Sequence, residues 1–182
     1  MPPMLTRPML GLIFVLSMNA CGGQTPSSTD QAGALSLGQA APAFQAPDQE
    51  GVVRSLAELR GKFVVLYFYP RDATPGCTRE ACAFRDAWSR FEAANAVVVG
   101  VSTDDSESHA EFASEHELPF PLLADTDERI ADAYGVAVRL GFAQRMTFLI
   151  DPQGRVRHVF ESVDPGVHAD EVLEVIAQLA AD

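Results

Sequence analysis

The chain has 182 residues, of which 47% are hydrophobic and 21% charged, and its formal net charge is −12. A chain of this length can bury one substantial core, so we expect a single globular domain. Because no cluster of Lys and Arg offsets the acidity, the composition excludes a nucleic-acid-binding protein. The charge favours a small neutral substrate or a cationic protein surface as partner, although solubility alone explains it equally well.

The N-terminal segment differs in composition from the rest of the chain. Its only charged residue is Arg7, and residues 10–16 form an apolar run of the length found at the centre of signal peptides. Crossing a bilayer takes about twenty apolar residues, so this run is too short to span one comfortably. Because Ala20 precedes Cys21, the segment resembles a bacterial lipoprotein signal, with residues 1–20 removed and Cys21 lipidated. The resemblance implies a lipid-anchored protein exported to the periplasm or cell envelope; plain secretion and an uncleaved anchor are the alternatives.

After the signal, residues 21–34 are rich in Gly, Ser, Thr and Gln without apolar periodicity, which predicts a flexible tether. Residues 63–69 (FVVLYFY) form a continuous apolar run typical of a strand buried on both faces, and residues 97–101 (VVVGV) form a second one. The segment 78–94 between them predicts a helix, because apolar residues recur at spacings of three and four along one stripe. The stripe consists of Ala81, Phe84, Trp88 and Phe91.

Further along the chain, residues 106–116 and 127–134 are shorter helical candidates. Two strands, 146–150 and 156–160, flank the turn sequence Asp-Pro-Gln-Gly and predict a hairpin. Residues 169–180 place apolar side chains on one face and predict a C-terminal helix. Strands that alternate with helices and end in a hairpin and a helix predict an α/β domain, with a central mixed sheet flanked by helices.

The most informative segment is 69–82, YPRDATPGCTREAC, which follows the first predicted strand and opens the amphipathic helix. It therefore lies at the carboxyl end of a strand, where open α/β sheets place their ligands. Thr74 followed by Pro75 predicts a helix N-cap with proline in the first helical position. Cys77 then falls in the first turn, where free backbone N–H groups and the positive end of the helix dipole favour a thiolate. Since the thiolate is the reactive species, Cys77 is a candidate nucleophile.

Cys82 is the second thiol of this helix, five residues after Cys77. In an intact helix the two Cα atoms are on the order of 8–9 Å apart, whereas disulfides rarely tolerate more than about 7 Å. A disulfide between the two residues requires the first turns of the helix to unwind, which makes oxidation a conformational switch. The spacing also excludes the Cys-x-x-Cys motif of ordinary redox dithiols.

Three residues of this segment resemble the peroxiredoxin active-site motif Pro-x-x-x-Thr-x-x-Cys: Pro70, Thr74 and Cys77. The additional residues Thr78, Glu80 and Cys82 resemble the subfamily of bacterioferritin comigratory protein and peroxiredoxin Q, whose second cysteine lies in the same helix. Glu80 is expected to orient neighbouring polar groups.

The resemblance extends over residues 37–179. It includes 41–44 (APAF), 100–102 (GVS), 118–120 (LPF) and 145–151 (RMTFLID), the last of which resembles the segment that carries the active-site arginine of the family. It implies a thioredoxin-like fold for the domain at residues 35–182.

The resemblance also implies a role for each matching residue. Cys77 is expected to be the peroxidatic nucleophile, which breaks the O–O bond and becomes a sulfenic acid. Thr74 would offer its hydroxyl to the thiolate and the peroxide, Arg145 would stabilise negative charge, and Pro70 would shield the sulfur from water. Cys82 would attack the sulfenic acid to form an intramolecular disulfide.

These roles imply a thiol peroxidase that reduces hydrogen peroxide and organic hydroperoxides to water and alcohols, without a metal or organic cofactor. A thioredoxin-like dithiol protein would reduce the Cys77–Cys82 disulfide. The resemblance to this subfamily implies a monomer. No metal site is expected, because two cysteines at this spacing do not form one and the histidines show no ligand spacing. The histidines are His109, His116, His158 and His168.

Two other functions are compatible with the same cysteines. A thiol–disulfide oxidoreductase would act on protein substrates, although the absence of Cys-x-x-Cys argues against it. A redox sensor or binding lipoprotein would signal through helix unwinding. Each residue taken alone also has a structural explanation: a cysteine in a helix is commonly a small buried apolar residue, and Arg145 would be a surface charge. Asp104 and Asp105 are interpreted as the solvated start of an acidic helix.

Overall fold

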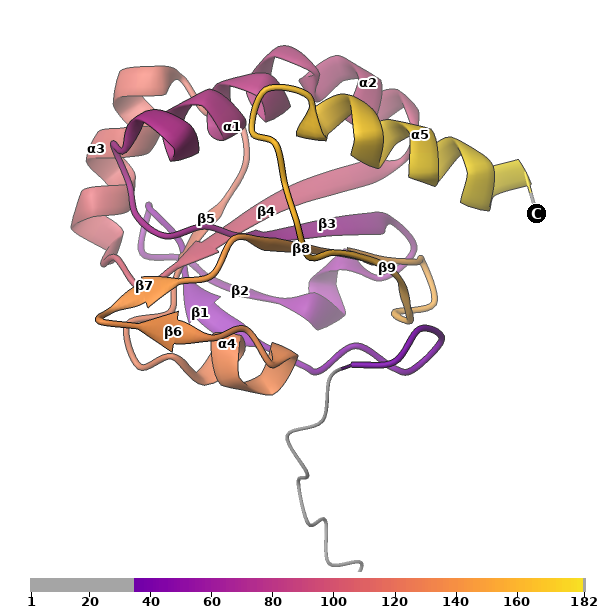
Figure 1. Cartoon of the computed structure of the whole chain (residues 1–182), viewed down its shortest axis with the longest axis horizontal. Helices are drawn as coiled ribbons and strands as arrows, with labels where there is room; N and C mark the ends of the chain where they lie inside the picture. The colour runs from indigo at the N-terminus through magenta and orange to yellow at the C-terminus, as the bar shows by residue number, and fades with distance from the viewer. Residues whose placement is uncertain (1–34, 182) are drawn as a thin grey trace, which may run out of the picture. The chain divides into compact units, whose positions relative to one another are not determined.

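The computed structural model describes residues 35–181, so the predicted signal, tether and lipidated Cys21 lie outside the described residues. At its centre is a five-stranded sheet in the order β5-β4-β3-β8-β9 (Figure 1). The first three of these strands are parallel to one another, whereas β8 is antiparallel to both β3 and β9. In sheet order, the strands are β5 (Leu122–Ala124), β4 (Ala96–Ser102), β3 (Phe63–Phe68), β8 (Met146–Ile150) and β9 (Val156–Phe160).

One face of the sheet is covered by α1 (Pro75–Asp86), α2 (Trp88–Ala93) and α5 (His168–Ala181), with α3 (Ser106–His116) beside β5 (Figure 1). The core on this side combines alternate residues of the strands with the apolar side of each helix. It includes Val65, Tyr67, Phe84, Phe91, Phe112, Val172 and Ile176. The predicted α/β architecture, with a mixed sheet flanked by helices, is confirmed.

The opposite face of the sheet packs against shorter elements, which the sequence patterns mostly missed. They are β1 (Gln45–Pro47), β2 (Val53–Ser55), the 3₁₀ helix η1 (Leu56–Leu59), α4 (Arg129–Tyr134), β6 (Val138–Arg139) and β7 (Phe142–Ala143). Strands of two or three residues are too short to show alternation, so only α4 was predicted. The core on this side includes Phe44, Leu56, Leu66, Phe68, Ile130, Tyr134 and Phe148.

The predicted continuous helix at 78–94 is divided in the structure into α1 and α2. Ala87, at φ −91° and ψ 3°, is the C-cap of the first helix and the N-cap of the second. Its N–H donates to the Ala83 carbonyl, and its own carbonyl accepts from Arg90 and Phe91. The bend therefore costs few backbone hydrogen bonds and leaves the side chain of Phe91 fully buried. None of the helices between residues 35 and 181 is long and apolar enough to cross a membrane.

Gly100 in β4 determines how closely the side chains of two neighbouring strands pack. It lies between Tyr67 of β3 and Leu122 of β5 in the register of the sheet. A Cβ atom on Gly100 would lie 2.8 Å from the hydroxyl oxygen of Tyr67 and 2.7 Å from Cδ2 of Leu122. Because both neighbours are fully buried, neither side chain can move away without disturbing the core.

We expect Gly100→Ala to lower the free energy of unfolding by about 1–3 kcal/mol, since it overpacks this contact. Urea denaturation measures the change. Gly166→Ala is the matched control, because its Cβ atom would approach no atom closer than 3.4 Å, and it should change stability by less than about 0.5 kcal/mol. Equal stability of the two variants would contradict the packing role of Gly100.

Candidate active site

The pairing of β3 with β8 brings Arg145 to Cys77. Because the two strands are antiparallel, the first residue of β8, Met146, lies opposite the last residue of β3, Phe68. Arg145 immediately precedes β8 and therefore lies at the end of the sheet where β3 leads into α1. Its Nη2 atom lies 3.1 Å from the Sγ atom of Cys77, although the two residues are 68 positions apart.

The start of α1 agrees with the sequence prediction. Thr74 is the N-cap in an extended conformation, Pro75 is the first helical residue, and Cys77 follows in the first turn. The first helical hydrogen bond runs from the N–H of Thr78 to the carbonyl of Thr74, at 2.9 Å. Gly76 and Cys77 precede that bond, so their N–H groups lack the usual helical acceptor. The Cys77 residue is 2% exposed.

Thr74 and Pro70 lie in the segment that joins β3 to α1. The hydroxyl of Thr74 does not cap the helix; it donates to the carbonyl of Arg71 at 3.1 Å. Pro70 is half-buried. The predicted residues Pro70, Thr74, Cys77 and Cys82 thus lie within one connection and the helix that follows it. Of these four, Arg145, directly before β8, contacts Cys77.

Glu80 is the second partner of Arg145. It lies one helical turn after Cys77 and is fully buried, and its Oε2 atom accepts from Nη1 of Arg145. Burial raises the pKa of Glu80 to about 7, against the opposing effect of the guanidinium. Burial acts to lower the pKa of Arg145, but Glu80 and Cys77 outweigh it, so the pKa is raised and the side chain stays charged. The guanidinium therefore bridges a thiol and a carboxyl group on one side of α1.

Further polar groups lie buried between α1 and the sheet. The hydroxyl of Tyr67 has no hydrogen-bond partner within residues 35–181, and burial raises its pKa well above 10, so the phenol is neutral. On β8, the hydroxyl of Thr147 lies 2.8 Å from Nε2 of His168, the first residue of α5. Burial lowers the pKa of His168. Histidine spacing in the sequence did not indicate this contact.

Asp72 forms a network that the sequence analysis missed. Its carboxylate accepts from the hydroxyls of Tyr69, at 2.7 Å, and Ser108, at 2.8 Å. It also lies 2.8 Å from Nδ1 of His109. Tyr69 follows β3, whereas Ser108 and His109 lie on α3, so the network ties the connection before α1 to a separate helix. In the sequence, the one sign of this network is Asp72 itself, the single acidic residue between Tyr69 and Cys77.

The interpretation of Asp104 as a solvated residue was wrong, whereas Asp105 does lie at a helix start. The side chain of Asp104 is only 12% exposed, and it accepts from the Asp72 N–H at 2.9 Å and from the Ser102 hydroxyl at 2.7 Å. Asp105 is the N-cap of α3 and accepts from the Ser108 N–H. The two adjacent aspartates thus bind different donors: Asp104 holds the Asp72 backbone, and Asp105 caps α3.

Ala73 has an unusual backbone conformation for a residue with a side chain. Its φ of 53° lies in the left-handed region, which costs an Ala residue on the order of 1–3 kcal/mol. It lies between Asp72 and Thr74, directly before the helix that carries Cys77. The connection is therefore held in its conformation by its neighbours rather than by local preference.

Cys82 lies further along α1 and is half-buried. Both Cys77 and Cys82 are unbridged, and α1 is continuous over both residues. The structure thus places the two thiols in the intact helix from which the sequence analysis inferred that a disulfide requires unwinding.

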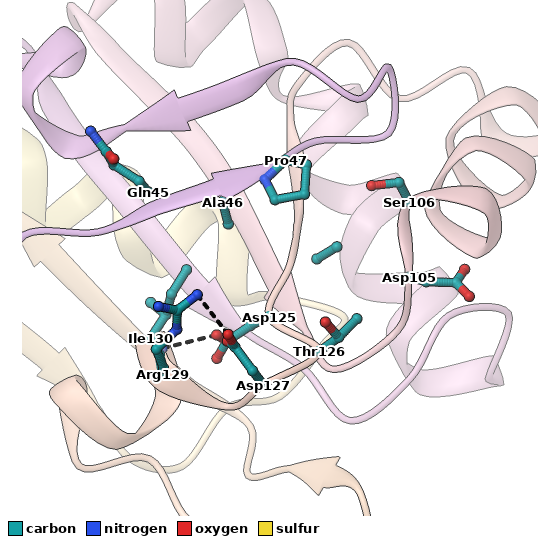
Figure 2. Close-up of a pocket in the computed structure, with 11 residues that line it drawn as sticks. Gln45, Ala46, Pro47, Asp105, Ser106, Asp125, Thr126, Asp127, Arg129 and Ile130 are labelled. Atoms are coloured by element: carbon teal, nitrogen blue, oxygen red, sulfur yellow. Dashed lines mark hydrogen bonds and ion pairs between the residues drawn. The ribbon is translucent and has the colours of Figure 1, made fainter.

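A separate pocket of about 320 Å³ lies away from both thiols, between β1, β5 and α4 (Figure 2). Its charged groups are already paired: Asp125 accepts from the N–H groups of Ile130 and Ala131, and Arg129 pairs with Asp127 at 2.6 Å. Asp125 thus caps the start of α4, and no cysteine lines the pocket. Across residues 35–181, no group of three or more His, Cys, Asp or Glu side chains is placed to hold a metal ion.

Comparison with known proteins identifies the family of the chain. Residues 37–159 match the model of the AhpC/TSA family. The chain is 45% identical over 146 residues to a putative peroxiredoxin bcp of Coxiella burnetii, covering 76% of this chain and 97% of that protein. It is 44% identical over 148 residues to the chloroplastic peroxiredoxin Q of Populus jackii, covering 80% of this chain and 70% of that protein.

A solved structure shows the same architecture. It is the bacterioferritin comigratory protein of Xanthomonas campestris, described for its alkyl peroxide reduction activity, with a TM-score of 0.74 and 33% identity over 80% of this chain and 98% of that one. The fold is therefore the thioredoxin-like fold of peroxiredoxins. With a family match over two thirds of its length and a buried thiol held against an arginine, the chain belongs to the AhpC/TSA family and is a peroxiredoxin, a thiol-dependent peroxidase.

Proposed function

We propose that the protein reduces hydrogen peroxide and organic hydroperoxides to water and alcohols through Cys77. The observation that carries the proposal is the 3.1 Å contact between Arg145 and Cys77 Sγ in a buried site. The permanent cation stabilises the thiolate and the charge that develops on the peroxide oxygens. The thiolate attacks one oxygen, the O–O bond breaks, and the other oxygen leaves as alkoxide or hydroxide and is protonated. Cys77 becomes a sulfenic acid.

Thr74 and Pro70 complete the peroxide site. Because the Thr74 hydroxyl donates its proton to the Arg71 carbonyl, its oxygen is left to accept a hydrogen bond from the incoming peroxide. Pro70, half-buried before it, limits the access of water to the sulfur. Glu80 holds the guanidinium through Nη1, which leaves Nη2 directed at the thiolate.

Cys82 closes the catalytic cycle. Once α1 unwinds, the thiolate of Cys82 attacks the sulfur of the Cys77 sulfenic acid. The Cys77–Cys82 disulfide forms, and the oxygen of the sulfenic acid leaves as hydroxide and is protonated to water. A thioredoxin-like dithiol protein then reduces the disulfide by thiol–disulfide exchange. The alkyl peroxide reduction described for the Xanthomonas campestris relative supports organic hydroperoxides as substrates.

Peroxide consumption by the purified protein, coupled to thioredoxin, thioredoxin reductase and NADPH, tests this function. We expect turnover by the wild-type protein and none by Cys77→Ser, because no other thiol within residues 35–181 contacts the guanidinium. Cys82→Ser should consume one equivalent of peroxide and then stop, since the sulfenic acid is not resolved.

Trp88, the only tryptophan, begins α2 directly after the helix break, so its fluorescence should change when the wild-type disulfide forms and stay unchanged in Cys82→Ser. Undiminished turnover by Cys82→Ser would mean that the reductant reaches the sulfenic acid directly. Stoichiometric oxidation of the wild-type protein without turnover under any reductant would favour a sensor.

Arg145→Ala should slow the oxidation of Cys77 by roughly 10²–10³-fold, the loss typical of one removed charge-stabilising donor. Rapid mixing with hydrogen peroxide, in the absence of reductant, isolates this step. Arg157→Ala is the control, because this arginine lies on β9 and pairs with Asp151 rather than with the thiol. A near-normal rate in Arg145→Ala would remove Arg145 from the proposed site.

Glu80 should make stability depend on pH. Its pKa is raised to about 7 in the folded protein but is near 4.3 in an unfolded chain, so the folded state binds more protons between these values. The stability contributed by the neutral form is present below about pH 4 and is lost as the pH rises through 7, by an amount on the order of 4 kcal/mol.

Urea denaturation between pH 4.5 and 8 measures this dependence. We expect Glu80→Gln to remove it, because the amide does not titrate. Glu111→Gln, at an exposed position of α3, is the control and should keep the wild-type profile. An identical profile in Glu80→Gln would show that the buried carboxyl does not titrate in this range.

A further inference from the structure

The carboxylate of Asp72 is anchored from two directions. Tyr69 donates to one oxygen, whereas Ser108 and His109 approach the other oxygen from α3, at 2.8 Å each. Burial acts to raise the pKa of Asp72, but the hydrogen bonds from His109, Tyr69 and Ser108 outweigh it, so the pKa is lowered and the carboxylate is charged. Since a carboxylate only accepts, Nδ1 of His109 must carry the proton that it shares with Asp72.

The position of His109 is not explained by packing alone. The side chain is fully buried, and its Nε2 atom has no partner within the part of the chain that the structure describes. A buried polar atom without a partner destabilises the fold, and an apolar residue of similar size would avoid that cost. The shortest polar contact of the ring is that of Nδ1 with Asp72, at 2.8 Å, whereas the Tyr69 hydroxyl lies 3.5 Å from the same atom.

The anchor lies directly beside the strained residue. Ala73, with its left-handed backbone, follows Asp72 and precedes Thr74. The backbone N–H of Asp72 is also held, by Asp104 at 2.9 Å. A strained residue persists only where its surroundings over-determine its conformation. Here the fixed side chain and fixed N–H of Asp72 supply that constraint on the N-terminal side, and α1 supplies it on the other.

We propose that Asp72 and His109 are positioning residues of the peroxidase: they hold the 70–74 connection in the strained conformation that aligns Pro70 and Thr74 for peroxide attack at Cys77. Their side chains form hydrogen bonds with each other, Tyr69 and Ser108 and not with the sulfur, so they act through the connection and not on the thiolate. The inference rests on the proposed function and deepens it, because it adds a residue of α3, His109, to the residues on which peroxide reduction depends.

A positioning role predicts a difference between two reactions of the same thiol. Peroxide must be aligned by Thr74 and its neighbours, whereas an alkylating reagent such as iodoacetamide needs only an accessible thiolate. Loosening the connection should therefore slow oxidation much more than alkylation. A general loss of structure would instead change both rates, or the stability alone.

The test uses the full chain with Cys82→Ser as the parent, so that each reaction stops at Cys77. Second-order rates with hydrogen peroxide and with iodoacetamide are measured on the Cys77 peptide by mass spectrometry. Asp72→Asn and His109→Leu should react with peroxide about 10- to 100-fold more slowly, the scale of a small misplacement in a reacting site. Their alkylation rates should stay within about threefold of the parent.

His109→Asn is the rescue variant, because its side-chain N–H₂ can occupy the place of the Nδ1 donor. It should restore the peroxide rate to within about threefold of the parent. Asp151→Asn is the matched control: Asp151 is also a buried aspartate, but it lies in the turn after β8, at the far end of the strand from Arg145. It should leave both rates unchanged.

Parent-like peroxide rates in Asp72→Asn and His109→Leu would overturn the inference and leave the proposed function intact. Equal losses of both rates would overturn it too, since the thiolate itself would then be affected. A parent that is alkylated but does not react with peroxide would instead disprove the proposed function, and the inference with it. If His109→Leu does not fold, Ser108→Ala removes a half-buried donor of the same carboxylate and must show the same selective loss.

Discussion

The antiparallel pairing of β8 with β3 is the constraint on which the candidate active site depends. It places the start of one strand against the end of the other, so that Arg145 and Cys77 meet although neither is near the other in the sequence. The pairing lies in the middle of the sheet, where both faces are covered and the strand residues are almost fully buried. The packing of the core therefore fixes the backbone from which the Arg145 side chain extends.

The charge arrangement follows from that position. A partly buried arginine needs partners, and Arg145 has two on the same helix: the thiol of Cys77 and the carboxyl of Glu80. Removing either partner leaves the cation less well compensated in a place that water reaches poorly. Because burial raises the pKa of Glu80 to about 7, the carboxyl can change its charge near neutral pH. A charged Glu80 attracts the guanidinium more strongly than a neutral Glu80 does. The balance between the interactions of Arg145 with the carboxyl and with the sulfur therefore depends on pH.

Sequence patterns predicted the elements whose formation depends on residues close together in the chain. The apolar run of β3, the β8–β9 hairpin around its turn and the start of α1 at Thr74 and Pro75 all depend on neighbouring residues, and the structure agrees with each. The approach of Arg145 to Cys77 was expected only from family resemblance, because no periodicity relates residues 68 positions apart.

Apart from Asp72 itself, no pattern in the sequence indicates the network around this residue. Its donors come from the end of β3 and from α3, and a buried aspartate in a polar connection looks like any solvated one until the fold brings its partners together. The same applies to Asp104, whose carboxylate accepts a hydrogen bond from the Asp72 backbone, 32 positions earlier in the chain. Short strands such as β5 were missed for a different reason, since three residues show no period.

The intact helix over Cys77 and Cys82 also determines how long the sulfenic acid of the proposed cycle persists. In the proposed cycle, a newly formed sulfenic acid waits for α1 to open before Cys82 can reach it, and during that wait a second peroxide molecule competes to form the irreversible sulfinic acid. The opening is limited in extent, because α1 has 12 residues and ends at the bend of Ala87, beyond which α2 can stay docked through Phe91. The stability of three helical turns would thereby determine the peroxide concentration above which the enzyme inactivates itself.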